Sequence, residues 1–400
     1  MARKRKKSPR RFVLFFGAGA AVPFGYPTTE GILPAVRAAI APGLKPSQRP
    51  KWLRDAEQYN PTLSTDLRTG LKHVFPGLRR LGKQDTVSII DVLSLLDHLI
   101  ASKQSLSPRF AGDRLLTMRR YLALCMNGVL RGTQKPQIRK NVVNWVLRQV
   151  AAGNRVSLVT TNYDTSYDWP LFKAIAPENR QRVLFERVDF GTSVLNPRSV
   201  EFNRPARSSV AVLKLHGSLN SLRCEQCGHL YVNPTDRIET LEYWEEVNEF
   251  NQCKCLGRLR SILVAPSLVR DVREPHLLSI WNAALNELRL AHEWYFAGYS
   301  LPQEDIAIRS LLLRAYHGRR LKKLRVRLAL YDPAEIRRRA ANPAPPPSGA
   351  DQLLKEELAR KTLQRYRDFL PDKHFVPDEW SYFPTGIEDF AKALAAETAQ

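Results

Sequence analysis

Short apolar runs that alternate with helical patterns are the feature that most constrains the fold of this chain. Buried strands of a parallel sheet read as continuous apolar runs, because both of their faces are covered. Such runs occupy Phe12–Phe16, Val156–Thr160, Val210–Leu215, Ile262–Ala265, Trp294–Ala297 and Val326–Leu330. Helical patterns lie between them at Gln137–Ala152, Leu277–Leu290 and Asp305–Tyr316. The alternation predicts an α/β fold, a Rossmann-like doubly wound parallel sheet.

A long helix-rich section separates the first apolar run from the second. It covers about residues 30–135, and its clearest helical patterns are Val87–Ile100 and Leu115–Leu130. We therefore expect a helical insertion within one domain that spans residues 12–340.

The segment after residue 340 has a different composition. Residues 341–351 are rich in proline and predict a linker. Residues 352–400 carry helical patterns at Gln352–Leu370 and Ile387–Ala396. These helices either pack back on the domain or dock a partner, and the sequence leaves both open.

The first residues combine a basic head with an apolar run, as a secretion signal does. The alternative is a disordered basic tail, residues 1–11, that leads into the first strand. We favour the tail, because cleavage would remove the glycine loop that follows. No later run approaches the roughly 20 apolar residues of a membrane span. With few cysteines, this predicts a cytoplasmic protein.

Three predicted strands end in residues suited to binding or catalysis. Gly17-Ala18-Gly19-Ala20 follows the first run, Thr161-Asn162-Tyr163-Asp164 the second, and His216 the third. Ligands of open α/β sheets bind at the carboxyl ends of strands, where glycines let the backbone approach a phosphate. Each residue has a structural alternative: a steric glycine turn, an Asx turn or a hydrogen-bonded histidine. Their joint occurrence predicts a ligand site.

Four of the five cysteines form two close pairs, Cys224-x-x-Cys227 and Cys253-x-Cys255. Four thiolates suit tetrahedral zinc in a structural site, since no coordination position stays open. We predict a zinc module over residues 222–260, with an unoccupied site as the alternative. Cys125 stands alone in an apolar stretch and is expected in the core.

The chain carries 62 Lys and Arg against 39 Asp and Glu, a formal net charge of +23. Basic residues are densest at Arg3–Arg11 and Arg314–Arg339. Such a surface attracts polyanions, so nucleic acid, anionic lipid and an acidic partner all remain open. The alternative is a basic surface without a polyanionic partner.

Five segments, taken in order, resemble the SIR2 family, especially the SIR2-like domains of prokaryotic antiviral defence systems. They are GAGA at 17–20, TTNYD at 160–164, KLHGS at 214–218, the cysteine segment, and AGYSLPQED at 297–305. The likeness spans about residues 12–335. It implies NAD as ligand and Asn162 and His216 as catalytic residues. The NAD-binding residues that it implies are Gly17, Ala18, Gly19, Ala20, Thr28, Thr161, Asp164, Gly298, Ser300 and Asp332.

The resemblance also implies a reaction, cleavage of the bond between nicotinamide and ribose. Asn162 would hold a ribose hydroxyl or a water, and His216, an imidazole with an unperturbed pKa of about 6.5, would act as base. The amides of Gly17–Gly19 would cradle the pyrophosphate.

Two departures from the family pattern bear on the nucleophile. Residues 25–30 keep the Gly and Pro of a sirtuin segment but lack its Asp, Phe and Arg, and residues 264–268 lack the peptide-clamping Phe-Gly-Glu. Water is therefore the expected nucleophile, which makes the chain an NAD glycohydrolase and, by resemblance, a defence effector that depletes NAD. Such an effector is expected to form a homo-oligomer or a complex with another defence protein. The alternatives are an NAD-dependent protein deacylase, or a basic zinc-bearing nucleic-acid-binding protein with a vestigial NAD site.

Overall fold

The computed structural model describes most of the 400 residues. The described residues are 9–78, 87–130, 136–174, 188–195, 201–202, 204–205, 207–234, 252–263, 275–303, 305–329, 350–376 and 386–397. No helix among them is both long and apolar enough to cross a membrane.

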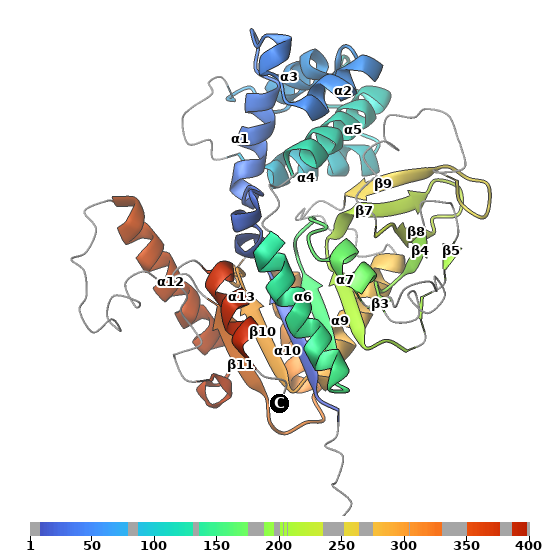
Figure 1. Ribbon diagram of the computed structural model, residues 1–400. Helices are drawn as coiled ribbons and strands as arrows, with labels where there is room; N and C mark the ends of the chain where they lie inside the picture. The colour runs from blue at the N-terminus through green and yellow to red at the C-terminus, as the bar shows by residue number, and fades with distance from the viewer. Residues whose placement is uncertain are drawn as a thin grey trace, which may run out of the picture.

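A six-stranded parallel sheet forms the centre of the protein, with the order β11-β10-β1-β2-β6-β3 (Figure 1). Its strands are β1 (Arg11–Phe16), β2 (Arg155–Thr160), β3 (Val188–Asp189), β6 (Val210–Lys214), β10 (Glu293–Ala297) and β11 (Arg325–Ala329). Every neighbouring pair is parallel. The predicted fold class is confirmed, and five of the six predicted strands lie in this sheet. The two-residue edge strand β3 was not predicted, because so short a segment has no readable periodicity.

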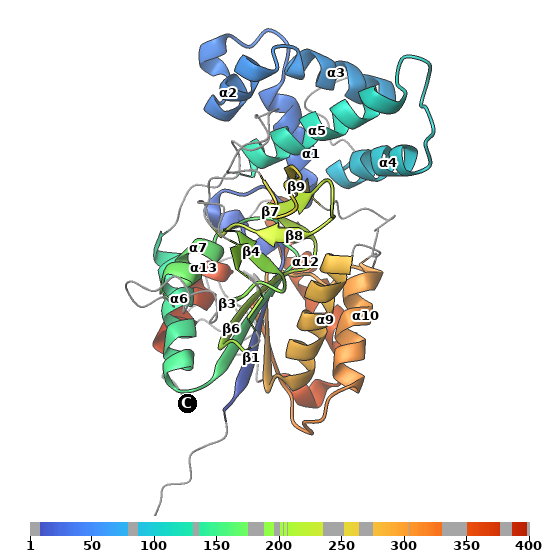
Figure 2. The same cartoon turned by 90° about the vertical axis from the view of Figure 1, so that its right-hand side faces the viewer.

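Both faces of the central strand β1 are covered by helices, as Figure 2 shows. Phe12, Leu14 and Phe16 pack on one face, where the helices are α6 (Pro136–Ala151), α7 (Asp168–Ala174) and α13 (Ile387–Ala396). Val13 and Phe15 face the other way, toward α9 (Pro275–Leu290), α10 (Ile306–His317) and α12 (Ala350–Phe369). Since side chains alternate along a strand, this explains the unbroken apolar run. The two C-terminal helices therefore pack back on the domain.

The predicted helical insertion forms a layer above the carboxyl edge of the sheet (Figure 1). Its helices are α1 (Thr29–Ala39), α2 (Lys51–Tyr59), α3 (Leu63–Val74), α4 (Ile89–Ala101) and α5 (Gly112–Val129). They share a buried core of their own, which includes Cys125 as expected. Thr28 is the N-cap residue of α1, although its side chain makes no capping hydrogen bond.

A second, five-stranded sheet of order β5-β4-β8-β7-β9 carries the cysteines. Its strands are β4 (Ser193–Leu195), β5 (Glu201–Phe202), β7 (Gly217–Cys224), β8 (Leu230–Val232) and β9 (Leu259–Leu263). The prediction that Ile262–Ala265 belongs to the parallel sheet is wrong. Residues 262 and 263 lie in β9, which is antiparallel to β7, and residues 264 and 265 lie outside the described residues. A four-residue apolar run is compatible with either sheet, because periodicity does not encode the pairing partner.

The basic tail ends earlier than predicted. Arg11 is the first residue of β1, and Arg10 forms an ion pair with the buried Glu293. Arg11 lies 3.9 Å from the carboxylate of Glu287. The predicted tail, residues 1–11, is therefore too long at its C-terminal end, because buried acceptors on β10 and α9 hold these two arginines.

The loops that follow β1 and β10 are in direct backbone contact. The amide of Gly17 donates to Ala297 O at 3.0 Å, and that of Gly19 donates to Gly298 O at 2.9 Å. Gly298 has a φ of +63°, and a Cβ on it would lie 2.0 Å from the Ala20 nitrogen. The glycines are thus required for this contact.

Replacing Gly298 by Ala should strongly destabilise the protein. Gly43 offers a matched control, because its φ is also positive (+81°) but nothing lies within 4 Å of an added Cβ. We expect Gly43→Ala to lower the free energy of unfolding by about 1 kcal/mol and Gly298→Ala by clearly more, roughly 3 kcal/mol or above. Urea denaturation measures both. Equal losses in the two variants would show that the two loops do not depend on close contact.

Candidate functional site

The carboxyl edge of the sheet brings the predicted catalytic residues onto adjacent strands. Thr160, the last residue of β2, pairs with both Phe16 of β1 and Lys214 of β6. Asn162 and His216 each follow their strand by two residues. The ring of Tyr163 lies 6.4 Å from the ring of His216, which is buried at 6% exposure. The structure thus places the glycine loop, Asn162 and His216 along one edge.

The side chain of Asn162 is held in one orientation. Its Nδ2 donates to the carbonyl of Gly17 at 2.9 Å, and its backbone amide donates to Thr160 Oγ1 at 2.9 Å. The Thr160 hydroxyl in turn donates to Phe16 O. Within the described part of the chain no donor reaches Asn162 Oδ1. This oxygen can therefore accept a hydrogen bond from a ligand hydroxyl or a water.

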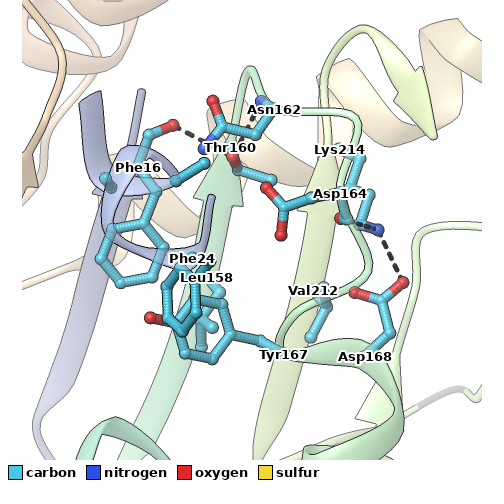
Figure 3. A pocket seen from close by; sticks show the side chains of 12 residues that line it. Phe16, Phe24, Leu158, Thr160, Asn162, Asp164, Tyr167, Asp168, Val212 and Lys214 are labelled. Carbon is cyan, nitrogen blue, oxygen red and sulfur yellow. Dashed lines mark hydrogen bonds and ion pairs between the residues drawn. The ribbon is translucent and has the colours of Figure 1, made fainter. Parts of the chain in front are cut away.

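A pocket opens beside Asn162, between β1, β2, β6 and the start of α7 (Figure 3). Its apolar walls are Phe16, Ala20, Ala21, Phe24, Leu158 and Val212. The polar groups at its lining include Asp164 and Tyr167. Asp164 Oδ1 accepts from the amide of Ser166, which fixes the carboxylate. The pocket is small and mainly apolar, with space for about one or two water molecules.

Tyr167 was not identified from the sequence. Its ring stacks on Phe16 at 5.2 Å, and its buried hydroxyl has no hydrogen-bond partner among the described residues. Burial, and then the negative charge of Asp164, raise the pKa of Tyr167 above its usual range, so the phenol stays neutral. A buried unpartnered hydroxyl costs stability, which is typical of a position where a ligand or water completes the bonding.

A buried ion pair supports the loop that carries Asn162. The Lys214 ammonium lies 2.7 Å from Asp168 Oδ2, and the two residues are 6% and 1% exposed (Figure 3). Lys214 also donates to Asp164 O at 2.7 Å and to Ser218 Oγ at 2.6 Å. The Ser218 hydroxyl donates to Tyr163 O at 3.1 Å. Lys214 therefore fixes both residues that follow Asn162, and all three of its protons are used.

Asp168 is the member of this pair whose charged form burial most disfavours. Burial raises its pKa, while Lys214 and a hydrogen bond from Asn220 act in the opposite direction. Neither Lys214 nor Asp168 was identified from the sequence. The available signal was a lysine inside an otherwise apolar strand, since such a residue needs a buried partner.

Lys214→Met should destabilise the protein by about 3–5 kcal/mol, because it leaves the Asp168 carboxylate buried without its counter-ion. The double variant Lys214→Met/Asp168→Leu should be more stable than Lys214→Met alone, since it removes the uncompensated charge. A double-mutant cycle from urea denaturation measures the coupling. Additive effects of the two substitutions would mean that the pair contributes no coupling energy.

The other residues that the resemblance implies for NAD binding do not all lie at the pocket. Thr161 donates its amide to Phe16 O at 3.1 Å, and Ala20 lines the pocket. The amides of Gly17 and Gly19, predicted to cradle a pyrophosphate, instead donate to carbonyls of the β10 loop, because the two loops pack together. Asp332 lies outside the described residues.

Helix α12 covers the segment that follows β10. Tyr366 OH donates to Tyr299 O at 3.0 Å, and Arg365 donates to Ser300 O at 3.3 Å. Gly298 and Ser300 therefore lie between the glycine loop and this helix.

The four clustered cysteines come together as predicted. Cys224 Sγ lies 3.4 Å from Cys255 Sγ, and Cys227 Sγ lies 3.6 Å from Cys253 Sγ. All four sulfurs lie within 4.8 Å of one another. Four thiolates at about 2.3 Å from a tetrahedral ion would be about 3.8 Å apart, so the donor set fits a metal ion. His229 bonds Ser193 Oγ at 3.1 Å instead of joining the cluster.

The cluster favours ionisation of one thiol over its neighbours. Burial raises the pKa of Cys224, but hydrogen bonds from the Cys227 and Gln226 amides and from neighbouring thiols bring it down to about 7. The pKa of Cys227 is raised to about 12, because burial and hydrogen bonds to the other thiols outweigh a backbone bond from His229. Four sulfurs this close cannot all ionise together unless a cation neutralises them.

No family model matches the chain, and no curated protein does. Among similar solved structures is a mutant Sir2 homologue in complex with ADP-ribose, with 16% identity over 92% of this chain and 98% of that chain (TM-score 0.33). Another is a Sir2 homologue in complex with NAD, with 15% identity over 88% and 90% (TM-score 0.30). A third is a Sir2 mutant with a peptide and NAD, with 12% identity over 97% and 92% (TM-score 0.32). The chain is thus similar, distantly, to proteins of the family that its motifs resemble.

Proposed function

We propose that the protein hydrolyses NAD⁺ at the bond between nicotinamide and ribose. One observation carries this proposal: Asn162 is held by Gly17 O beside a pocket, and its Oδ1 is not bonded by any described residue. Asn162 and His216 follow neighbouring strands of the sheet. The motif resemblance adds the identity of the ligand, because these are the positions that it implies for catalysis.

The proposed reaction needs few groups. The C1′–N1 bond breaks, its electron pair stays on nicotinamide, and the ribose becomes an oxocarbenium ion. Water attacks C1′ and gives up a proton to His216, so that NAD⁺ and water yield nicotinamide, ADP-ribose and a proton. Asn162 Oδ1 would orient the water or a ribose hydroxyl. Positioning and proton removal both lower the barrier.

The nicotinamide ring would bind beside Asn162, where the small pocket would widen to admit it. Phe16 and Phe24 offer aromatic walls. The Asp164 carboxylate can accept from the carboxamide NH₂, and the Tyr167 hydroxyl can bond either the ring substituent or a water. A carboxylate at this place would repel the acidic analogue of nicotinamide, which fits an amide-bearing ring.

Wild-type protein should release nicotinamide and ADP-ribose from NAD⁺ without any acylated peptide. Asn162→Ala and His216→Ala should each lower kcat by about 100-fold or more, the range for loss of a general base or a positioning group. His229→Ala is the matched control, because that imidazole bonds Ser193 away from the edge and should leave turnover unchanged. Chromatography of the products measures all four proteins.

Two results would overturn the proposal that the protein is an NAD hydrolase. Turnover that appears only with an acyl-lysine peptide would establish a deacylase. Equal activity of the wild type and both variants would exclude this site as the catalytic centre.

We also propose that Cys224, Cys227, Cys253 and Cys255 hold a structural Zn²⁺. Mass spectrometry should find about one zinc per chain, and Cys227→Ser/Cys255→Ser should lose it. Cys125→Ala is the control, since that thiol lies in the helical core and should leave the metal content unchanged. Equal zinc in both variants would argue against this site.

The motif resemblance further supports a cytoplasmic role in antiviral defence, with depletion of NAD as the effect and a homo-oligomer or a second defence protein as the restraint. Cellular NAD should then fall when wild-type protein is triggered and stay constant with Asn162→Ala. Unchanged NAD in triggered cells that contain active protein would exclude this role.

A further inference from the structure

Basic side chains gather at the amino edge of the parallel sheet, opposite the edge that carries Asn162. They come from the end of α9, from α10 and the turn that joins it to β11, and from the 3₁₀ turn after α12. We call this surface the amino-edge patch, and its members are Arg289, Arg314, Arg320, Lys322, Lys323 and Lys373. All are exposed except Arg289, which is half-buried. In Figure 1 the α10–β11 turn lies at the bottom of the molecule, far from α2 and α3 at the top.

The patch is built on a fixed framework. Arg319 donates to Leu288 O and to Lys323 O, both at 3.2 Å, and its guanidinium lies 5.7 Å from the ring centre of Trp294. His374 contacts Leu324 O at 3.2 Å, which places the neighbouring Lys373 beside the same turn. The exposed charges therefore extend from an anchored turn, which reduces the entropy lost when they bind.

The charge of the patch is not neutralised locally. None of its six members forms an ion pair with a carboxylate of the residues that the structure describes. Burial lowers the pKa of His292, and the positive charges of Arg10, Arg319 and Arg11 lower it further. Burial likewise lowers the pKa of His374, and Lys373 and Arg319 add to this effect despite a bond to Leu324 O. After burial, positive charges at this edge contribute to both shifts, and Arg319 is common to the two.

We propose that the amino-edge patch binds the phosphate backbone of nucleic acid. Arginine and lysine supply the charge-assisted contacts that phosphates require, and the contacts need no base sequence. An anionic membrane is less suited, because interfacial binding needs large apolar side chains among the basic ones. Of the exposed large apolar residues, Leu313 is the one nearest to the patch in sequence, at 37% exposure. This inference is independent of the proposed NAD hydrolysis, since it concerns the opposite edge.

The test compares two triple charge reversals of equal size. The first, Arg320→Glu/Lys322→Glu/Lys323→Glu, removes half of the patch. The control, Lys51→Glu/Arg54→Glu/Lys72→Glu, changes three exposed residues of α2 and α3 that form no ion pair with a described carboxylate. Fluorescence anisotropy with labelled 20-nucleotide single-stranded and duplex DNA measures affinity between 50 and 200 mM salt. Vesicles with phosphatidylserine form a parallel arm.

The patch variant should bind duplex DNA at least about tenfold more weakly than the wild type, with a salt slope reduced by up to about 3, because each lost phosphate contact removes about one unit. The control should keep most of the wild-type affinity and slope. Both variants should keep the wild-type melting temperature and the basal NAD turnover. Because the assay measures DNA binding alone, failure of the proposed hydrolysis would not affect this test. Equal loss in the two variants, absence of DNA binding by the wild type, or patch-dependent binding to vesicles alone would each overturn the proposal.

Discussion

The close contact between the loops after β1 and β10 is the constraint on which the site depends. Gly17 and Gly298 have no side chains, so the two backbones meet directly, and the amides of Gly17 and Gly19 donate to Ala297 O and Gly298 O. The Gly17 carbonyl then accepts a hydrogen bond from Nδ2 of the Asn162 side chain. Packing between β1 and β10 therefore fixes the carbonyl that holds Asn162 just beyond the end of β2. Under the proposed function this matters, because a catalytic group must be held to within a fraction of an ångström.

Lys214 gives a second support to the loop that carries Asn162. Lys214 bonds the Asp164 carbonyl directly and the Tyr163 carbonyl through Ser218, while Asp168 balances its charge. A buried ion pair is weak evidence for stability, because desolvation offsets most of the attraction. Its value here is geometric: Asn162 lies between a glycine contact on one side and a charged anchor on the other. The charged anchor bonds backbone carbonyls of the loop, whereas the glycine contact depends on the side chain of Asn162 itself.

The sequence was sufficient to predict the sheet, most helices, the cysteine cluster and the edge that carries Asn162 and His216. These follow from local patterns: apolar runs, helical periodicity, paired cysteines and polar residues after strands. It was not sufficient for the strand Ile262–Ala265 or for Lys214, Asp168 and Tyr167, because each depends on a partner distant in the chain. The glycine loop shows the same limit. Its presence was predictable, but the commitment of its amides to the β10 loop depends on residues about 280 positions away.

The central place of β1 has a consequence for how the chain is made. Its sequence Arg-Phe-Val-Leu-Phe-Phe leaves the ribosome before the other described strands. One neighbour, β10, ends only at Ala297, and the covering helices α12 and α13 come after residue 349. During synthesis the backbone groups along this aromatic, β-prone strand therefore stay unpaired on the β10 side, which favours pairing with another chain. Arg10 and Arg11, at the start of this strand, are made long before Glu287 and Glu293, the acidic residues that hold them in the folded protein. Until then their like charges oppose pairing with a second nascent copy.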